Sequence, residues 1–241
     1  MKNSLILMIV FFTFSNCKSY LLRNAASNGD YQSVQQYVNE KVAPNSKNWS
    51  GETPLIMATK NGYLDVVKVL LQANADLNMR DNKGNSALNW AVSNRYVEIA
   101  KILVNKKADV NSSNDQGSTP LINASYKGHV EMVNILIESG ADPNLANHHG
   151  ITPLMWSSIK GFVEVTKSIL KVSPNIDQKD ETGMTSLMYA SKNGRTEIVR
   201  LLLEKKANPI LVDKKNMSAL NYASEYGQSE IQILLLAAVG K

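Results

Sequence analysis

The chain has 241 residues, of which 44% are hydrophobic and 20% are charged, and this composition is ordinary for a folded domain. Its formal net charge is +5, but basic and acidic residues are interleaved along the whole chain instead of gathering in one stretch. This distribution argues against nucleic acid as the main ligand.

The N-terminal segment has the layout of a secretory signal. Lys2 is followed by an apolar run from Leu5 to Phe14, and Cys17 follows shortly after it. This run is too short to cross a bilayer, because a membrane-spanning helix needs about 20 apolar residues. We therefore expect residues 1–17 to be a signal peptide and the chain to be exported.

Cys17 is the only cysteine, which excludes an internal disulfide framework. The sequence Phe14-Ser15-Asn16-Cys17 resembles the lipobox of bacterial lipoproteins, although Phe14 and Asn16 depart from its usual residues. The resemblance implies a lipidated Cys17 as the first mature residue, and acyl chains would hold the domain at a membrane. Lys18, where an Asp would signal inner-membrane retention, favours the outer membrane. The alternative is a plain secretory signal cut nearby and a periplasmic protein.

A unit of 33 residues recurs without insertions along the rest of the chain. Its head recurs as Thr53-Pro54-Leu55-Ile56, Ser86-Ala87-Leu88-Asn89, Thr119-Pro120-Leu121-Ile122, Thr152-Pro153-Leu154-Met155, Thr185-Ser186-Leu187-Met188 and Ser218-Ala219-Leu220-Asn221. One period earlier, Asn28-Gly29 stands in the register of Asn61-Gly62. Residues 18–241 are therefore predicted to form seven repeats, with boundaries near 18–50, 51–83, 84–116, 117–149, 150–182, 183–215 and 216–241.

Each unit is predicted to contain two helices and a loop. The head Thr or Ser can cap the first helix, Leu55 and Ala58 lie on one face of it, and Gly62 can end it in the left-handed conformation. The second helix carries apolar pairs such as Val66-Val67 at helical spacing. The loops close on residues that tolerate a positive φ, namely Gly51, Gly84, Gly117, Gly150, Gly183 and Asn216.

The period and the Thr-Pro-Leu signature resemble the ankyrin repeat, and the resemblance runs from about residue 19 to the C-terminus. It implies an all-α solenoid of helix-turn-helix units with short β-hairpin loops. It also implies that the chain binds other proteins through its concave face and its hairpin tips. Arg95 departs from the pattern, because it stands where the other units have a glycine.

The sequence contains no set of residues that resembles a catalytic or metal-binding site. His129 follows a helix-ending glycine, and His148 and His149 lie on one loop tip without further metal ligands nearby. There is no glycine-rich phosphate loop and no Gly-x-Ser-x-Gly motif. We therefore expect no catalytic, metal or cofactor site and no small-molecule substrate, and an enzyme is a remote alternative.

The partner surface is predicted from one position of the first helix that points away from the core. This position carries Met57, Trp90, Asn123, Trp156, Tyr189 and Tyr222 down the stack. Together with neighbouring columns, the candidate protein-binding residues are Trp90, Tyr126, Ile151, Trp156, Ile159, Met184, Tyr189, Tyr222 and Tyr226. Large aromatic side chains supply much of the energy of protein interfaces. In the alternative interpretation, the same side chains lie flat on the adjacent repeat as packing.

The sequence therefore predicts a non-catalytic scaffold in the bacterial envelope that binds another protein of unknown identity. A second interpretation is an accessory or inhibitor subunit that holds an exported enzyme. In both, the membrane is a partner only through a lipid on Cys17.

Overall fold

The computed structural model describes residues 17–240, and these residues form short α-helices joined by turns. The chain divides into two compact units, residues 1–115 and 116–241. The predicted signal peptide lies outside the described residues except for Cys17. The predicted all-α fold is confirmed.

In the first unit residues 17–28 are helical, and the helices after them are α2 (Tyr31–Asn39), α3 (Pro54–Lys60), α4 (Leu64–Gln72), α5 (Ala87–Ser93) and α6 (Val97–Asn105). The second unit contains α7 (Pro120–Lys127), α8 (Val130–Glu138), α9 (Pro153–Lys160), α10 (Val163–Leu170), α11 (Ser186–Lys192), α12 (Thr196–Glu204), α13 (Ala219–Glu225) and α14 (Ser229–Val239).

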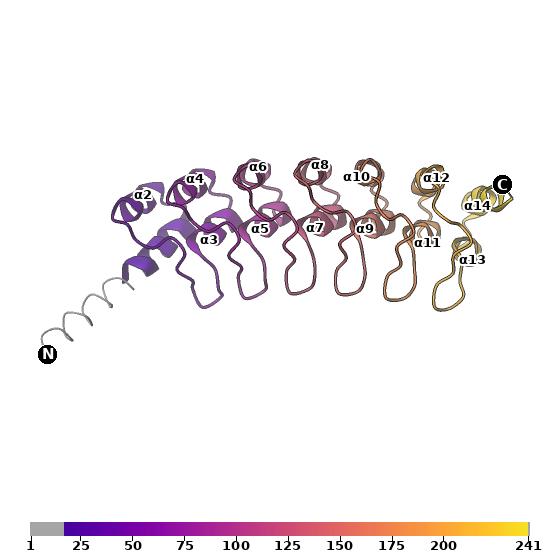
Figure 1. Ribbon diagram of the computed structural model, residues 1–241, viewed down its shortest axis with the longest axis horizontal. Helices are drawn as coiled ribbons and strands as arrows, with labels where there is room; N and C mark the ends of the chain where they lie inside the picture. Colours follow the sequence, from indigo (N-terminus) through magenta and orange to yellow (C-terminus); the bar gives the residue numbers. More distant parts are fainter. Residues whose placement is uncertain (1–16, 241) are drawn as a thin grey trace, which may run out of the picture. The chain divides into compact units, whose positions relative to one another are not determined.

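The helices of each unit alternate between two rows (Figure 1). First helices pack on first helices, as α7, α9, α11 and α13 do in turn, and second helices pack on second helices, as α8, α10, α12 and α14 do. The loops project from the row of first helices, away from the second row (Figure 1). We call the surface formed by the first helices and the loops the loop-side face of each unit.

The head residues cap the first helices as predicted. Thr53 Oγ1 accepts a hydrogen bond from the Ile56 amide at 3.2 Å, and Pro54 occupies the first turn. In α5 and α13, where Ala replaces the proline, an Asn completes a capping box. In α5, Asn89 Oδ1 accepts from the Ser86 amide at 3.1 Å, so a second hydrogen bond fixes the helix start.

The core lies between the two rows. Leu55, Ile56, Ala58 and Thr59 are buried on α3, whereas Met57 is half-buried, as the face assignment predicted. In the second helices at least one residue of each apolar pair is fully buried, but its neighbour is only half-buried at Ile102, Ile137, Leu203 and Leu234. The second helices therefore leave part of their apolar surface facing outward.

The loops are held by side chains and not by strand pairing. Among the described residues the only β-bridge joins Val212 and Ser218, so the expected β-hairpins contain no ladder. Several loops have an Asn or Asp whose side-chain oxygen accepts two backbone N–H groups, namely Asn48, Asp81, Asn147, Asp180 and Asp213. These bonds supply the turn with hydrogen bonds that a ladder would otherwise provide. The closing residues do have positive φ, for example 75° at Gly51 and 58° at Asn216.

Side chains also connect neighbouring loops within each unit. In the first unit Asn45 Oδ1 accepts from the Asp76 amide and Asn78 Oδ1 accepts from the Asp109 amide, both at 2.9 Å. In the second unit Asp177 Oδ1 accepts from the Asn208 amide at 2.9 Å. These bonds make each unit's loops a rigid surface.

Two backbone positions matter for stability. Arg95 has a φ of 60°, in the left-handed region, as its register predicted. Gly62 has a φ of 79°, and a Cβ atom there would lie 2.8 Å from Cζ of Tyr96. Gly62 is therefore required both by its backbone conformation and by the Tyr96 ring of the next helix pair.

Candidate functional site

The aromatic residues predicted at one position of the first helices differ in their burial and in their contacts. Trp90 in the first unit, and Trp156 and Tyr189 in the second, are half-buried, whereas Tyr222 is only 6% exposed. What distinguishes these residues is whether the polar end of the ring has a partner inside the protein.

Trp90 is tied to the loop that precedes its helix. Its Nε1 donates to Asp81 Oδ2 at 2.9 Å. Asp81 Oδ1 accepts from the amides of Lys83 and Asn85, both at 2.9 Å. The ammonium of Lys60 lies 4.8 Å from the centroid of the Trp90 ring. Trp90 therefore braces the loop against α5, which supports the packing interpretation for this residue.

Tyr189 and Tyr222 repeat this arrangement in the second unit. The Tyr222 hydroxyl donates to Asp213 Oδ2 at 2.6 Å, and the Tyr189 hydroxyl donates to Asp180 Oδ2 at 2.5 Å. In each aspartate the other oxygen caps the loop; Asp213 Oδ1 accepts from the amides of Lys215 and Met217. One carboxylate thus fixes both the loop and the ring nine residues later.

The hydrogen bonds perturb the ionisation of these groups. Burial and the neighbouring Asp213 carboxylate raise the pKa of Tyr222 to about 12. Burial and the bond to Asp180 also raise the pKa of Tyr189. Burial opposes ionisation of Asp213, but hydrogen bonds from Tyr222, Met217 and Lys215 outweigh it and hold the pKa of Asp213 below its ordinary value.

Trp156 lacks this carboxylate. The residue nine positions before it is Asn147, whose Oδ1 already accepts from the amides of His149 and Ile151. The other polar atom of Asn147 is an amide nitrogen, which is a donor and cannot accept the indole N–H. Trp156 instead meets Tyr126 edge to face, with ring centroids 4.8 Å apart.

Tyr126 makes this pair accessible. It is 43% exposed at the end of α7, and the ammonium of Lys160 lies 4.6 Å from its ring centroid. Ile159, on the same helix as Trp156, is half-buried. Tyr126 and Trp156, with Ile159 one helical turn further along α9, therefore form an apolar patch on the loop-side face of the second unit, and we call it the α7–α9 patch.

The remaining predicted residues also divide into buried and exposed ones. Ile151 and Met184 are 8% and 6% exposed, so they serve the core more than the surface. Tyr226 is 47% exposed, and Lys192 lies over both its ring and that of Tyr222. Tyr226 thus remains a surface candidate at the end of α13.

Sequence reasoning missed Trp49, which is fully exposed on a loop tip of the first unit. The signal was present, because the same position of the later loops carries only polar or charged residues: Asn82, Asp115, His148, Glu181 and Lys214. Trp49 lines a hollow of about 500 Å³ together with Tyr20, Arg23, Lys47 and Met57. We call it the Trp49 hollow.

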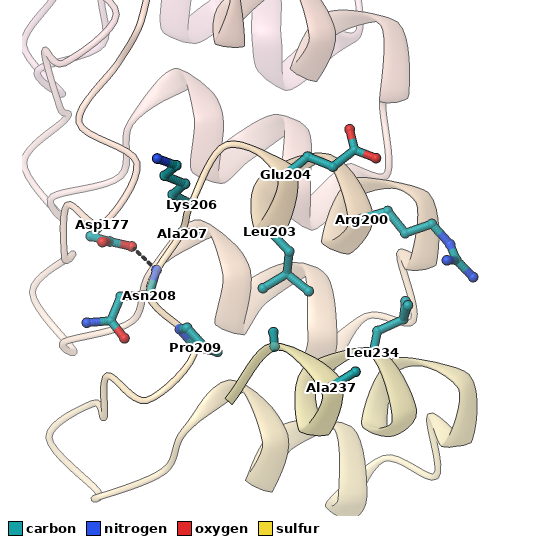
Figure 2. Close-up of a pocket in the computed structure, with 11 residues that line it drawn as sticks. Asp177, Arg200, Leu203, Glu204, Lys206, Ala207, Asn208, Pro209, Leu234 and Ala237 are labelled. Carbon is teal, nitrogen blue, oxygen red and sulfur yellow. Dashed lines mark hydrogen bonds between the residues drawn. The ribbon is translucent and has the colours of Figure 1, made fainter. Parts of the chain in front are cut away.

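A second hollow, of about 810 Å³, lies between α12 and α14 (Figure 2). Leu203 points from α12 towards α14, whose Leu234 and Ala237 line the opposite wall (Figure 2). Its rim contains two acids and two bases, namely Asp177, Glu204, Arg200 and Lys206. The two signs of charge are balanced, so this hollow has no strong charge preference, and Arg200 also pairs with Glu230 at 2.6 Å.

The described residues hold no group of three or more His, Cys, Asp or Glu side chains arranged for a metal ion. Of the two loop-tip histidines, His149 has its Nδ1 3.5 Å from Glu181 Oε2. Cys17 is exposed and carries a free thiol. Within residues 17–240, no helix has both the length and the apolar character needed to cross a membrane.

Pairs of short helices that recur every 33 residues, with capped loops between them, define a helical repeat protein. A family model of ankyrin repeats matches the chain in three copies, at residues 22–114, 107–180 and 163–241. The chain therefore belongs to the ankyrin-repeat family, whose members are in general protein–protein interaction modules and typically non-catalytic. No curated protein matches the chain.

Proposed function

We propose that the chain is a non-catalytic scaffold, exported to the bacterial envelope, that binds a partner protein on its loop-side faces. The observation that carries this proposal is the exposure of aromatic side chains on a rigid surface. Trp49 is fully exposed and Tyr126 is 43% exposed, although burial would stabilise both rings. Exposed aromatic side chains on a rigid backbone are typical anchors of protein interfaces.

The hydrogen bonds of the aromatic side chains indicate which of them belong to the binding surface. Trp90, Tyr189 and Tyr222 use their polar groups inside the protein, so they hold the loops in place. In the part of the chain that the structure describes, Trp49, Tyr126, Trp156 and Tyr226 have no such tether to a loop aspartate. We therefore assign the partner contacts to these four side chains and a supporting role to the other three.

Export to the envelope is supported by the sequence of residues 1–17 and by the exposure of Cys17. An exposed thiol at this place is accessible to an acylating enzyme, and acyl chains would anchor the repeats to a membrane. Mass spectrometry of the mature N-terminus tests this part. A lipid mass on Cys17 is expected, and an unmodified terminus cut at another residue would contradict anchoring.

Partner capture tests the binding function. The full chain is used as bait in cross-linked membrane and periplasmic extracts, beside a Tyr126→Ala, Trp156→Ala variant. Recovery of the partner should fall at least about tenfold, because the variant removes an aromatic anchor. The matched control is Tyr31→Ala, an exposed aromatic on the second-helix row.

Equal recovery by both variants and the unaltered chain would refute the role of the α7–α9 patch. The captured protein also separates the two functional interpretations. An exported enzyme whose activity changes on binding would make this chain an accessory or inhibitor subunit. A partner without enzymatic activity would make it an adaptor.

A further inference from the structure

The Trp49 hollow has a fixed shape because its loop is held on both sides. Asn48 Oδ1 accepts from the amides of Ser50 and Glu52 at 2.9 and 2.8 Å, which closes the loop on itself. Asn82 of the next loop donates its side-chain amide to the Trp49 carbonyl at 2.8 Å. The Trp49 backbone is therefore rigid while its indole ring remains in solvent, an arrangement that folding does not require.

The hollow carries positive charge that the described chain does not neutralise. Arg23 Nη1 donates to Ser46 Oγ at 2.9 Å, and Lys47 Nζ donates to the Arg80 carbonyl at 2.7 Å. Both acceptors are neutral, so they orient the cations without cancelling their charge. None of the described residues that line the hollow is acidic. An anionic group entering it would gain charge-assisted hydrogen bonds.

Apolar surface lies beside these two cations. Trp49 and Met57 line the same hollow, and Tyr20 at its edge is 56% exposed. A ligand that matches this lining needs an anionic group next to an apolar side chain. This combination distinguishes the hollow from the one between α12 and α14, whose rim has balanced charges.

We propose that the Trp49 hollow binds an acidic segment of the partner protein, with a carboxylate at Arg23 and Lys47 and an apolar side chain against Trp49. This inference rests on the proposed function and adds the chemistry of the partner. A peptide is favoured over a bilayer because Arg23 is half-buried, so its guanidinium is reached by a narrow chain rather than by a flat surface.

The test begins with selection of random dodecapeptides, displayed on phage, against the immobilised chain of residues 18–241. Selected peptides should be enriched in Asp and Glu beside an aromatic or aliphatic residue, and depleted in Lys and Arg. The strongest peptide is then synthesised, and its affinity is measured for the unaltered chain and for variants. Raising the salt from about 50 mM to about 500 mM should weaken binding, because screening reduces charge attraction.

An Arg23→Gln, Lys47→Gln variant should bind the synthetic peptide at least about tenfold more weakly, and so should Trp49→Ala. The control is Lys83→Gln, Lys106→Gln, which makes the same change in net charge outside the hollow and should bind within about twofold of the unaltered chain. Urea midpoints of all variants separate loss of binding from loss of folding. Trp49→Ala is a second probe in case the loss of the Arg23–Ser46 bond unfolds the first helix.

Selection of no peptide, of peptides without acids, or of peptides equally sensitive to the control variant would overturn the inference. The proposed function would survive this result if captured protein still depended on Tyr126 and Trp156. Vesicles of phosphatidylcholine with about a quarter phosphatidylglycerol test whether the hollow binds lipid headgroups instead of a peptide. Vesicle binding that is lost in the Arg23, Lys47 variant, without any acidic peptide, would assign the hollow to lipid headgroups instead.

Discussion

Replacing Tyr222 with Phe should lower the free energy of unfolding by about 2 kcal/mol at neutral pH. The substitution keeps the buried ring and removes only the hydroxyl that donates to Asp213 Oδ2 at 2.6 Å. A hydrogen bond to an ionised group contributes about 1.5 to 3 kcal/mol, and the 6% exposure of Tyr222 limits replacement of the lost donor by water.

The effect should depend on pH in a defined direction. Because the folded-state pKa of Asp213 is held below its ordinary value, its contribution is complete above the unfolded pKa of about 3.9. It is lost as the pH falls through the folded pKa. The difference between the unaltered chain and Tyr222→Phe should therefore be constant near neutral pH and shrink below about pH 4.

The contribution of the Tyr222 phenol to stability depends on pH in the opposite direction, because it is lost as the pH rises. The folded-state pKa of Tyr222 is raised to about 12, so the neutral phenol is the form that the fold stabilises. Its contribution is complete below the unfolded tyrosine pKa of about 10 and is lost as the pH rises through the folded value. The same difference between the two proteins should then shrink at strongly alkaline pH.

Urea unfolding followed by far-ultraviolet circular dichroism measures this difference, provided that the denaturant slope stays the same in both proteins. Tyr226→Phe is the matched control, since Tyr226 is 47% exposed and should change stability by less than about 0.5 kcal/mol. A Tyr222→Phe effect as small as that of the control, or one that does not change in acid, would refute the bracing role of Asp213.

Three further substitutions test the repeat framework. Arg95→Gly should raise the free energy of unfolding by about 1 kcal/mol because it relieves a φ of 60°, and an unchanged or lower urea midpoint would contradict this. Gly62→Ala should lower the free energy of unfolding by more than about 1 kcal/mol, since the new Cβ meets the Tyr96 ring. Adding Tyr96→Ala to the same chain should reduce that loss. If the effects of the two substitutions on the urea midpoint simply add, the contact is contradicted. Thr53→Ala should lower the free energy of unfolding by about 1 kcal/mol through loss of the helix cap, and calorimetry that shows no decrease in melting temperature would contradict the cap.

The helices and their ends could be predicted because their signals are local. A capping Thr or Ser, a proline in the first turn and a left-handed glycine act within a few residues of their own helix. Because the repeat has a strict period of 33 residues, an assignment made in one unit applies to the same position of every other unit. Even the exception at Arg95 followed from its register, and its φ of 60° confirms the prediction.

The division of the aromatic column could not be predicted in the same way. It depends on a carboxylate nine residues earlier, and only the folded loop brings that carboxylate to the ring. The pattern is visible afterwards: Asp81, Asp180 and Asp213 precede braced rings, whereas Asn147 precedes Trp156. Trp49 could not be predicted for a different reason: the repeat pattern assigns partner contacts to helix positions, and Trp49 lies on a loop tip.

The most direct test of the binding account is hydroxyl-radical footprinting of the chain with and without its captured partner, read out by mass spectrometry. The account predicts that oxidation of Trp49 and Tyr126 falls in the complex, while oxidation of Tyr31 on the second-helix row stays the same. Protection of Tyr31 without protection of Trp49 or Tyr126 would place the partner on the other row and contradict the account.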